Sequence, residues 1–182
     1  IPSSISIGIN GSFAVWVGAL IEDLHQKIIV VAEEGKEEEV VLRLARVGYD
    51  NCIGYLKGGI DTWKNADKNL DTIESIEASD LKTRQEQNGG QIVDVRKPGE
   101  YEAEHVKDAI SYPLDYINDH LVDLDKEQEQ LVHCKSGYRS VIASSILKRN
   151  GYTNVVDIAG GFQAISDDGS LPMTEYVCPS TL

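Results

Sequence analysis

The chain has 182 residues, of which 41% are hydrophobic, and a formal net charge of −13. This length accommodates one large domain or two small ones, and the hydrophobic fraction is sufficient for a packed core. The negative charge, without any Lys/Arg-rich run, argues against nucleic acid or an anionic membrane as partner. Since no apolar run approaches a membrane span and no signal-peptide pattern is present, we expect a cytoplasmic protein.

The cysteines and histidines do not form the closely spaced sets that hold metals or disulfides. The cysteines are an odd and sparse set: Cys52, Cys134 and Cys178. The histidines are equally dispersed: His25, His105, His120 and His133. The absence of a disulfide framework or zinc knuckle is typical of a reducing compartment. We therefore expect no metal and no cofactor in this chain.

An internal repeat organises the sequence. Residues 47–51 recur as residues 150–154, and residues 55–60 correspond to residues 157–162. The start of the chain, residues 1–5, corresponds in the same way to residues 106–110. An offset that stays at about one hundred residues indicates two copies of one structural unit.

Each copy has the pattern strand, helix, strand. The apolar runs at residues 28–32 and 131–134 predict buried strands, and apolar positions at helical spacing follow each of them. Each helix ends at a glycine in the place of a left-handed cap, Gly48 or Gly151, before a second short apolar run. This order of elements is typical of a parallel α/β unit.

The second copy also has an earlier strand at residues 91–96, preceded by an amphipathic stretch at residues 79–87. The first copy has no equivalent, so we expect its counterpart to lie before Ile1, in a longer polypeptide from which this chain is cut. The polar segment 65–72 is the expected linker, with a boundary near Asp71. We thus predict a partial domain over residues 1–71 and a complete one over residues 72–182.

Cys134 lies where a parallel sheet binds ligands, at the carboxyl end of a predicted strand and just before a helix that we expect to start near Arg139 or Ser140. Loop amides, the helix dipole and the charges of Lys135 and Arg139 favour its thiolate. We predict that Cys134 is a nucleophile that attacks sulfur or another soft electrophile. The expected substrate-binding residues are Lys135, Ser136, Gly137, Tyr138, Arg139 and Ser140.

Several short motifs together resemble the rhodanese family over nearly all of residues 74–165. They are residues 94–96, 100–101, 105–106 and 112–114, then Cys134 with Gly137, Arg139 and Ser140, then residues 160–162. The resemblance implies an α/β fold with two rhodanese-like three-layer domains, in which helices flank parallel sheets and the first domain is incomplete at its N-terminus. It also implies a sulfurtransferase that carries sulfane sulfur as a persulfide on Cys134, with thiosulfate or a persulfide as donor and a thiol, sulfite or cyanide as acceptor.

Loop length separates two chemistries in this family. The phosphatase and arsenate reductase relatives use Cys-x5-Arg, whereas Cys134 to Arg139 is the shorter Cys-x4-Arg of the sulfurtransferases. The sequence departs from the family pattern at Glu104, where a Gly usually precedes the His, and at Glu100, where long tandem rhodaneses that use thiosulfate carry an Arg. A non-catalytic interaction module is the alternative from another functional class.

The first copy has no nucleophile at the corresponding position. Its loop spans residues 31–36, and either Val31 or Ala32 occupies the cysteine position, depending on the placement of one gap. Carboxylates replace the cationic surroundings, so we expect a structural or docking pseudo-domain. An inactive copy followed by an intact one resembles the C-terminal part of bacterial fusions that begin with a metallo-β-lactamase-fold persulfide dioxygenase, which would be the upstream partner domain.

Other candidate residues receive supporting or structural roles. Asp94 and Arg96 are expected to pin neighbouring loops by hydrogen bonds, since an Asp close to a thiolate would raise its pKa. Arg139 either meets substrate or pairs with a carboxylate at a helix start. His133 is expected on the opposite side of the strand from Cys134. Cys52 is assigned to the core, and a resolving role for Cys178 is left open.

Overall fold

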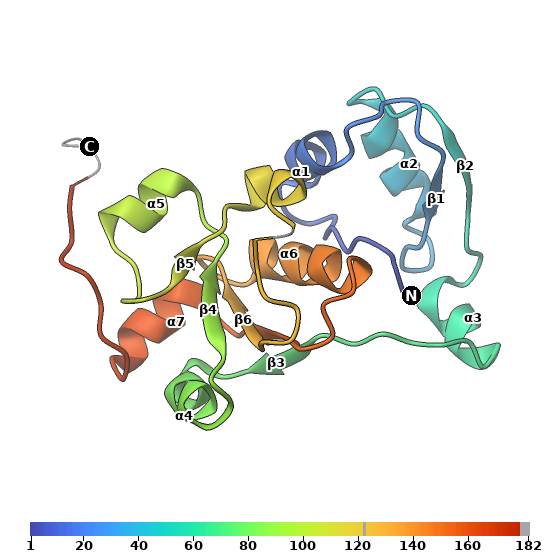
Figure 1. Ribbon diagram of the computed structural model, residues 1–182. Helices are drawn as coiled ribbons and strands as arrows, with labels where there is room; N and C mark the ends of the chain where they lie inside the picture. The colour runs from blue at the N-terminus through green and yellow to red at the C-terminus, as the bar shows by residue number, and fades with distance from the viewer. Residues whose placement is uncertain (122, 179–182) are drawn as a thin grey trace. The chain divides into compact units, whose positions relative to one another are not determined.

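The computed structural model describes residues 1–121 and 123–178, and the chain divides into two compact units (Figure 1). Unit 1 consists of Ile1–Pro2 and Ile7–Asp71, and unit 2 of Ser3–Ser6 and Thr72–Leu182. Within the described residues, no helix has the length and apolar character needed to cross a membrane.

Unit 2 is built on a five-stranded sheet in which all neighbouring strands are parallel, in the order β3-β7-β6-β4-β5. Its strands are β3 (Glu74–Ile76), β4 (Gln91–Asp94), β5 (Ile110–Ser111), β6 (Gln130–His133) and β7 (Val155–Ile158). All four residues of β6 and of β7 are buried. Continuous burial of this kind is expected when both faces of a parallel strand are covered.

Helices cover both faces of this sheet. They are α4 (Ala78–Asn88), α5 (Pro98–Ala103), α6 (Tyr138–Arg149), α7 (Gly161–Asp168) and the 3-10 helix η1 (Leu114–Asp119). Leu81 of α4 and Ile165 of α7 pack in one core cluster with Leu131, Val156 and Ile158 of the central strands. Helix α6 packs against β6 and β7 as well, and Figure 1 shows it on the other side of the sheet from α4 and α7.

Unit 1 contains a two-stranded parallel sheet with helices packed on it. Its elements are α1 (Phe13–Leu20), β1 (Ile28–Val30), α2 (Glu37–Ala45), β2 (Cys52–Tyr55) and α3 (Gly59–Asn65). The core is formed by Phe13 and Val17 of α1 with Val30, Leu44 and Tyr49.

The first predicted strand of unit 1 is shorter and more exposed than expected. The apolar run 28–32 was expected to form a buried strand, but β1 ends at Val30, the only buried residue of the three. Ile29 is 66% exposed, and Ile53 in β2 is exposed as well. The physical reason is that α1 and α2 cover one face of this small sheet, and no described helix covers the face that bears Ile29. Cys52, assigned to the core, is half-buried in β2.

The two units share a local backbone pattern at the end of their long helices. The amide of Tyr49 donates to Leu44 O, and the amide of Tyr152 donates to Leu147 O, both at 3.1 Å. The glycine before each tyrosine has a φ of 91° in unit 1 and 88° in unit 2, a conformation that glycine adopts without strain. The repeated sequence thus forms the same turn in both units.

Candidate active site

Cys134 directly follows β6, and a loop of three further residues connects it to α6. The helix begins at Tyr138, slightly earlier than expected. Gly137 has a φ of 105°, which favours glycine at this position, and its amide donates a 3.2 Å hydrogen bond to Cys134 Sγ. Only 1% of Cys134 is exposed. The sulfur is therefore buried against a backbone donor at the N-terminal end of a twelve-residue helix.

The start of α7 fixes the orientation of the cysteine loop. The amide of Phe162 donates to Cys134 O at 2.6 Å, and the amide of Gln163 donates to Lys135 O at 3.2 Å. Gly161 has a φ of 60°, and a Cβ there would lie 2.4 Å from Cys134 O. These contacts hold the loop carbonyls towards α7, and the sequence analysis did not predict them. The pair of glycines at residues 160–161 was the only sequence signal for this contact, and it was used there only as part of the family resemblance.

Arg139 pairs with Glu100 in the first turn of α5. Its two terminal nitrogens donate to the two carboxylate oxygens, at 2.6 and 2.9 Å. These bonds from Arg139, and a weaker one from the amide of Lys97, lower the pKa of Glu100 to about 2. The same ion pair raises the pKa of Arg139. Of the two roles considered for Arg139, the structure contains the pairing with a carboxylate at a helix start.

The other expected binding residues differ in their exposure. Lys135 and Ser136 are exposed, and Tyr138 is half-buried, which raises the pKa of its phenol. Ser140 is fully buried, and its hydroxyl donates to Gly137 O at 3.1 Å. The loop therefore presents Lys135 and Ser136 to solvent, while the hydroxyl of Ser140 is used inside the protein.

Asp94 and Arg96 form a buried pair after β4. The Asp94 carboxylate accepts bonds from the Arg96 backbone amide and from its guanidinium, the shortest at 2.6 Å. Arg96 also donates to Glu104 O at 2.8 Å, and its guanidinium lies 3.7 Å from the ring centre of Phe162. With Asp94 fully buried and Arg96 only 4% exposed, the pair links β4 to the segment after α5 and to the start of α7.

Sequence comparison identifies the family of this unit. Residues 77–168, about half of the chain, match the family described as Rhodanese-like domain. The chain belongs to the rhodanese-like domain family. The matched region contains β4, the Cys134 loop, α6 and the start of α7, so the geometry above is that of a rhodanese-like domain.

Among its relatives, thiosulfate sulfurtransferase PspE of Escherichia coli is 38% identical over 76 residues, which are 41% of this chain and 72% of PspE. The tRNA uridine(34) hydroxylase of Erwinia tasmaniensis is 38% identical over 76 residues, 38% of this chain and 22% of that protein. The crystal structure of a rhodanese-like domain protein from Staphylococcus aureus has a TM-score of 0.50 and 32% identity, and the match covers 55% of this chain and 97% of that one. Among the curated relatives, the two above included, the chain spans between 21% and 73% of the relative's length.

His133 precedes Cys134 in the rhodanese-like domain and is completely buried. Its Nδ1 lies 3.3 Å from Cys134 O, and burial lowers the pKa of the imidazole. Its Nε2 makes no hydrogen bond with the described residues and lies 3.9 Å from Asp94 Oδ2, which Arg96 already occupies. This environment favours a neutral structural imidazole. The described residues contain no group of three or more His, Cys, Asp or Glu side chains placed to hold a metal.

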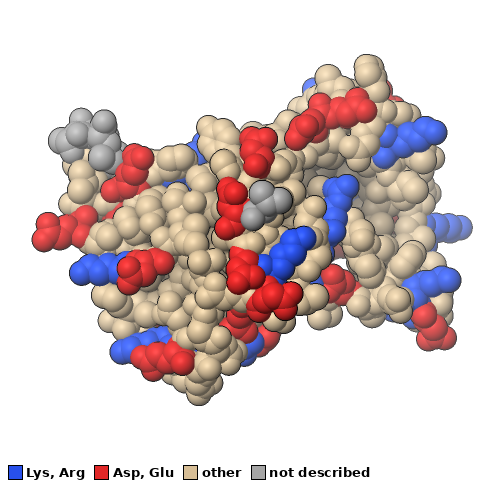
Figure 2. Space-filling model, in the orientation of Figure 1, with Lys and Arg blue, Asp and Glu red and all other residues tan. Residues whose placement is uncertain are grey.

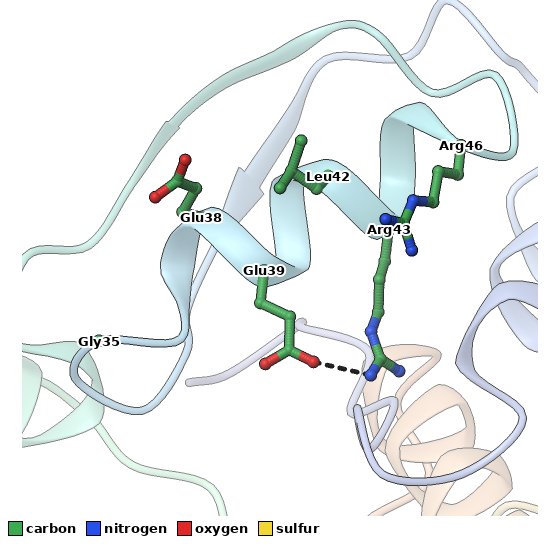
Figure 3. A pocket seen from close by; sticks show the side chains of 6 residues that line it. All are labelled: Gly35, Glu38, Glu39, Leu42, Arg43 and Arg46. Atoms are coloured by element: carbon green, nitrogen blue, oxygen red, sulfur yellow. Dashed lines mark hydrogen bonds and ion pairs between the residues drawn. The ribbon is translucent and has the colours of Figure 1, made fainter.

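Unit 1 has a surface hollow of about 460 Å³ on α2 (Figure 3). It is lined by Gly35, Glu38, Glu39, Leu42, Arg43 and Arg46. Arg43 in this hollow donates to Glu39 at 2.7 Å and to Ile9 O at 2.7 Å, so its charge is already engaged. On the face in Figure 2, basic side chains lie singly or in small groups among acidic ones. Neither feature resembles the arrangement around Cys134.

The unit 1 loop at residues 31–36, which we expected to correspond to the cysteine loop, makes a similar glycine contact. A Cβ on Gly59 would lie 2.4 Å from Ala32 O, the distance found between Gly161 and Cys134 O. Gly35 has a φ of 82° and stands three residues after Ala32, as Gly137 does after Cys134. This geometry aligns Ala32, rather than Val31, with the cysteine.

Proposed function

We propose that the rhodanese-like domain is a sulfurtransferase that carries sulfane sulfur as a persulfide on Cys134. The observation that carries the proposal is the 3.2 Å hydrogen bond from the Gly137 amide to Cys134 Sγ, at the N-terminus of α6 and inside a Cys-x4-Arg loop. A backbone donor and the helix dipole both favour the thiolate, and they stabilise a persulfide anion in the same way. The name of the relative PspE supports the same reaction class.

The proposed reaction consists of two nucleophilic displacements. The Cys134 thiolate attacks the outer sulfur of thiosulfate, the S–S bond of the donor breaks, and sulfite leaves with the electron pair. With a persulfide donor, a thiolate leaves instead. A thiol, sulfite or cyanide then attacks the outer sulfur of the Cys134 persulfide, and the Cys134 thiolate is released with its electron pair.

Loop size favours sulfur over phosphate as the transferred group. The loop from Cys134 to Arg139 is one residue shorter than the Cys-x5-Arg loop of phosphatase and arsenate reductase relatives. In addition, Arg139 is already held by two bonds to Glu100. A phosphate would have to displace this carboxylate, whereas a single sulfur needs only the loop amides.

A non-catalytic interaction module is the second candidate, and the burial of Cys134 favours it. A residue that is 1% exposed, next to an arginine already paired, is also the arrangement of a structural cysteine. The two candidates differ in whether the sulfur accepts a sulfane atom.

Mass spectrometry of the intact protein distinguishes the candidates. After incubation with thiosulfate or a small persulfide, we expect a gain of about 32 Da that is absent in Cys134→Ser and is lost when cyanide is added, with formation of thiocyanate. Cys178→Ser is the matched control and should retain the adduct. No adduct with either donor would contradict the sulfurtransferase proposal, and hydrolysis of an aryl phosphate would support the phosphatase relatives instead.

We further propose that unit 1 is a degenerate copy of the same fold, in a tandem arrangement with unit 2. The support consists of the shared turn at Tyr49 and Tyr152 and the equal glycine contacts at Ala32 and Cys134. In this proposal unit 1 serves structure or docking, and the upstream partner domain of the same polypeptide has the metallo-β-lactamase fold. Sequencing the intact polypeptide before Ile1 tests the presence of that domain.

A further inference from the structure

The two arginines around the cysteine loop are already matched by carboxylates. Arg139, in the first turn of α6, donates from its two terminal nitrogens to the two oxygens of Glu100, at 2.6 and 2.9 Å. Arg96 is likewise paired with Asp94, with a shortest contact of 2.6 Å. Each pair carries no net charge, so neither arginine offers an uncompensated positive charge to an approaching anion.

Lys135 is the remaining cation of the loop. Its side chain is exposed and forms no ion pair with the described residues. An exposed ammonium group is strongly hydrated and is screened by salt, so it holds an anion only weakly. A dianion such as thiosulfate therefore binds strongly at this loop only if the guanidinium of Arg139 becomes available to it.

The Glu100 carboxylate is a strong competitor for that guanidinium. A charged contact made by two parallel hydrogen bonds is stronger and more directional than a single one. Glu100 also accepts a 3.1 Å bond from the amide of Lys97, which fixes it at the start of α5. Hydrogen bonding from Arg139 is the main cause that lowers the pKa of Glu100 to about 2, so the group is ionised at neutral pH. Because this carboxylate is part of the protein, its effective concentration at Arg139 exceeds that of a free anion.

We propose that Glu100 is a specificity-determining residue, which by occupying Arg139 selects small organic persulfides over thiosulfate as donors to Cys134. A persulfide R–S–SH needs no arginine: the Cys134 thiolate attacks its outer sulfur, the S–S bond breaks, and RS⁻ leaves with the electron pair. Thiosulfate brings two negative charges and releases sulfite, so its binding and its departure both need a cation that Glu100 has neutralised. The choice of donor rests on the proposed sulfurtransferase function, whereas the exclusion of anions from Cys134 does not.

The first test compares two alkylating reagents of nearly equal size, anionic iodoacetate and neutral iodoacetamide, by mass spectrometry of the Cys134 peptide. The ratio of their rates reports attraction of an anion to the thiol, because the pKa and the accessibility of Cys134 affect both reagents alike. Glu100→Gln frees Arg139 and should raise the iodoacetate-to-iodoacetamide ratio at pH 7 about fivefold. In an Arg139→Gln background the same substitution should change the ratio less than about twofold, because no guanidinium remains to be released.

Glu102→Gln is the matched control, since Glu102 is exposed on the same helix and its substitution removes the same charge. Its rate ratio should stay within about 1.5-fold of that of the unchanged chain. A purely structural effect of Glu100→Gln would move both alkylation rates together and leave their ratio unchanged, which would overturn the proposal. An equal rise in Glu102→Gln, or an undiminished rise in the Arg139→Gln background, would also overturn it.

The second test measures the rate of the gain of about 32 Da on Cys134, with thiosulfate or cysteine persulfide as donor. We expect cysteine persulfide to load the unchanged chain faster than thiosulfate does. Glu100→Gln should raise the thiosulfate-to-persulfide rate ratio about tenfold, because the donor that gains carries two charges. An unchanged ratio would overturn the choice of donor. If neither donor adds sulfur, the proposed function fails, and the alkylation ratio still decides whether Glu100 excludes anions from Cys134.

Discussion

Glu100 and Arg139 are held face to face by two hydrogen bonds of 2.6 and 2.9 Å, although 39 residues separate them in the chain. The pair connects the first turn of α5 to the first turn of α6, and the charge of Arg139 interacts with Cys134. The Arg139 side chain is 14% exposed and that of Glu100 is 32% exposed, so water screens the pair only partly. Arg139 therefore contributes positive charge near the sulfur while a carboxylate fixes its position.

The first prediction concerns the pH dependence of stability. The folded protein lowers the pKa of Glu100 from 4.5 to about 2. The ionised group is thus favoured by folding, so its stabilisation is present above about pH 4.5 and is lost as the pH falls towards 2. Glu100→Gln should reduce the free energy of unfolding by about 1 to 2 kcal/mol at pH 7, between the values of exposed and buried pairs. Urea unfolding of both proteins should show this difference shrinking towards about pH 2.5; a constant difference would contradict it.

A second prediction separates a buried ion pair from an exposed one. Asp94→Ala leaves the Arg96 guanidinium buried without its partner, and we expect a loss of about 3 to 5 kcal/mol in the free energy of unfolding. Glu39→Gln removes an exposed partner of Lys36 and Arg43 and should change stability little. Chemical denaturation followed by circular dichroism measures both. Equal losses in the free energy of unfolding for the two substitutions would show that the buried pair stabilises the fold no more than the exposed one.

The third prediction addresses the contact between α7 and the cysteine loop. Gly161→Ala places a Cβ 2.4 Å from Cys134 O, in addition to the strain of a left-handed conformation. Gly89→Ala is the matched control, since Gly89 has a similar φ of 65° and no atom within 4 Å of its Cβ. We expect the control to lose only about 1 to 2 kcal/mol. Gly161→Ala should lose more stability and also change the alkylation rate of Cys134, and identical behaviour of the two variants would contradict the proposed clash.

The fourth prediction places a thiol in unit 1. Ala32→Cys, made together with Cys134→Ser, should not gain the mass of one sulfur under conditions that persulfidate Cys134. The reason is that Glu33 and Glu37 stand, by the same spacing, where Lys135 and Arg139 stand in unit 2, and carboxylates raise the pKa of a thiol. Adding Glu33→Lys and Glu37→Arg should raise the alkylation rate of the introduced thiol above its rate in the Ala32→Cys background alone. An efficient adduct without these charge changes would show that the loop backbone alone is sufficient.

The sequence predicted those features that depend on residues close together in the chain. Apolar runs and the following helical periodicity located β6, α6 and β7, because adjacent residues determine these patterns. The position of Cys134 at a strand end followed from the same reasoning. The glycine after α6, Gly151, marked the end of that helix through its left-handed conformation.

Contacts between distant segments were beyond a single sequence. A carboxylate partner was one of two expectations for Arg139, and only the fold selects Glu100 from the many carboxylates available. The amides of Phe162 and Gln163 could not be linked to the cysteine loop, since backbone donors have no sequence signature. Exposure of Ile29 was missed for a different reason: an apolar run predicts burial only if a neighbouring element exists to cover it.

The deep position of Cys134 has a consequence for the order of events during turnover. Addition of one sulfur lengthens the side chain by about 2 Å, the length of an S–S bond. In the proposed reaction only a small sulfur donor can therefore reach the buried thiol. The outer sulfur of the persulfide lies one bond further out than Cys134 Sγ. We expect bulky thiol reagents to react faster with the Cys134 persulfide than with the Cys134 thiol, although both groups belong to the same residue.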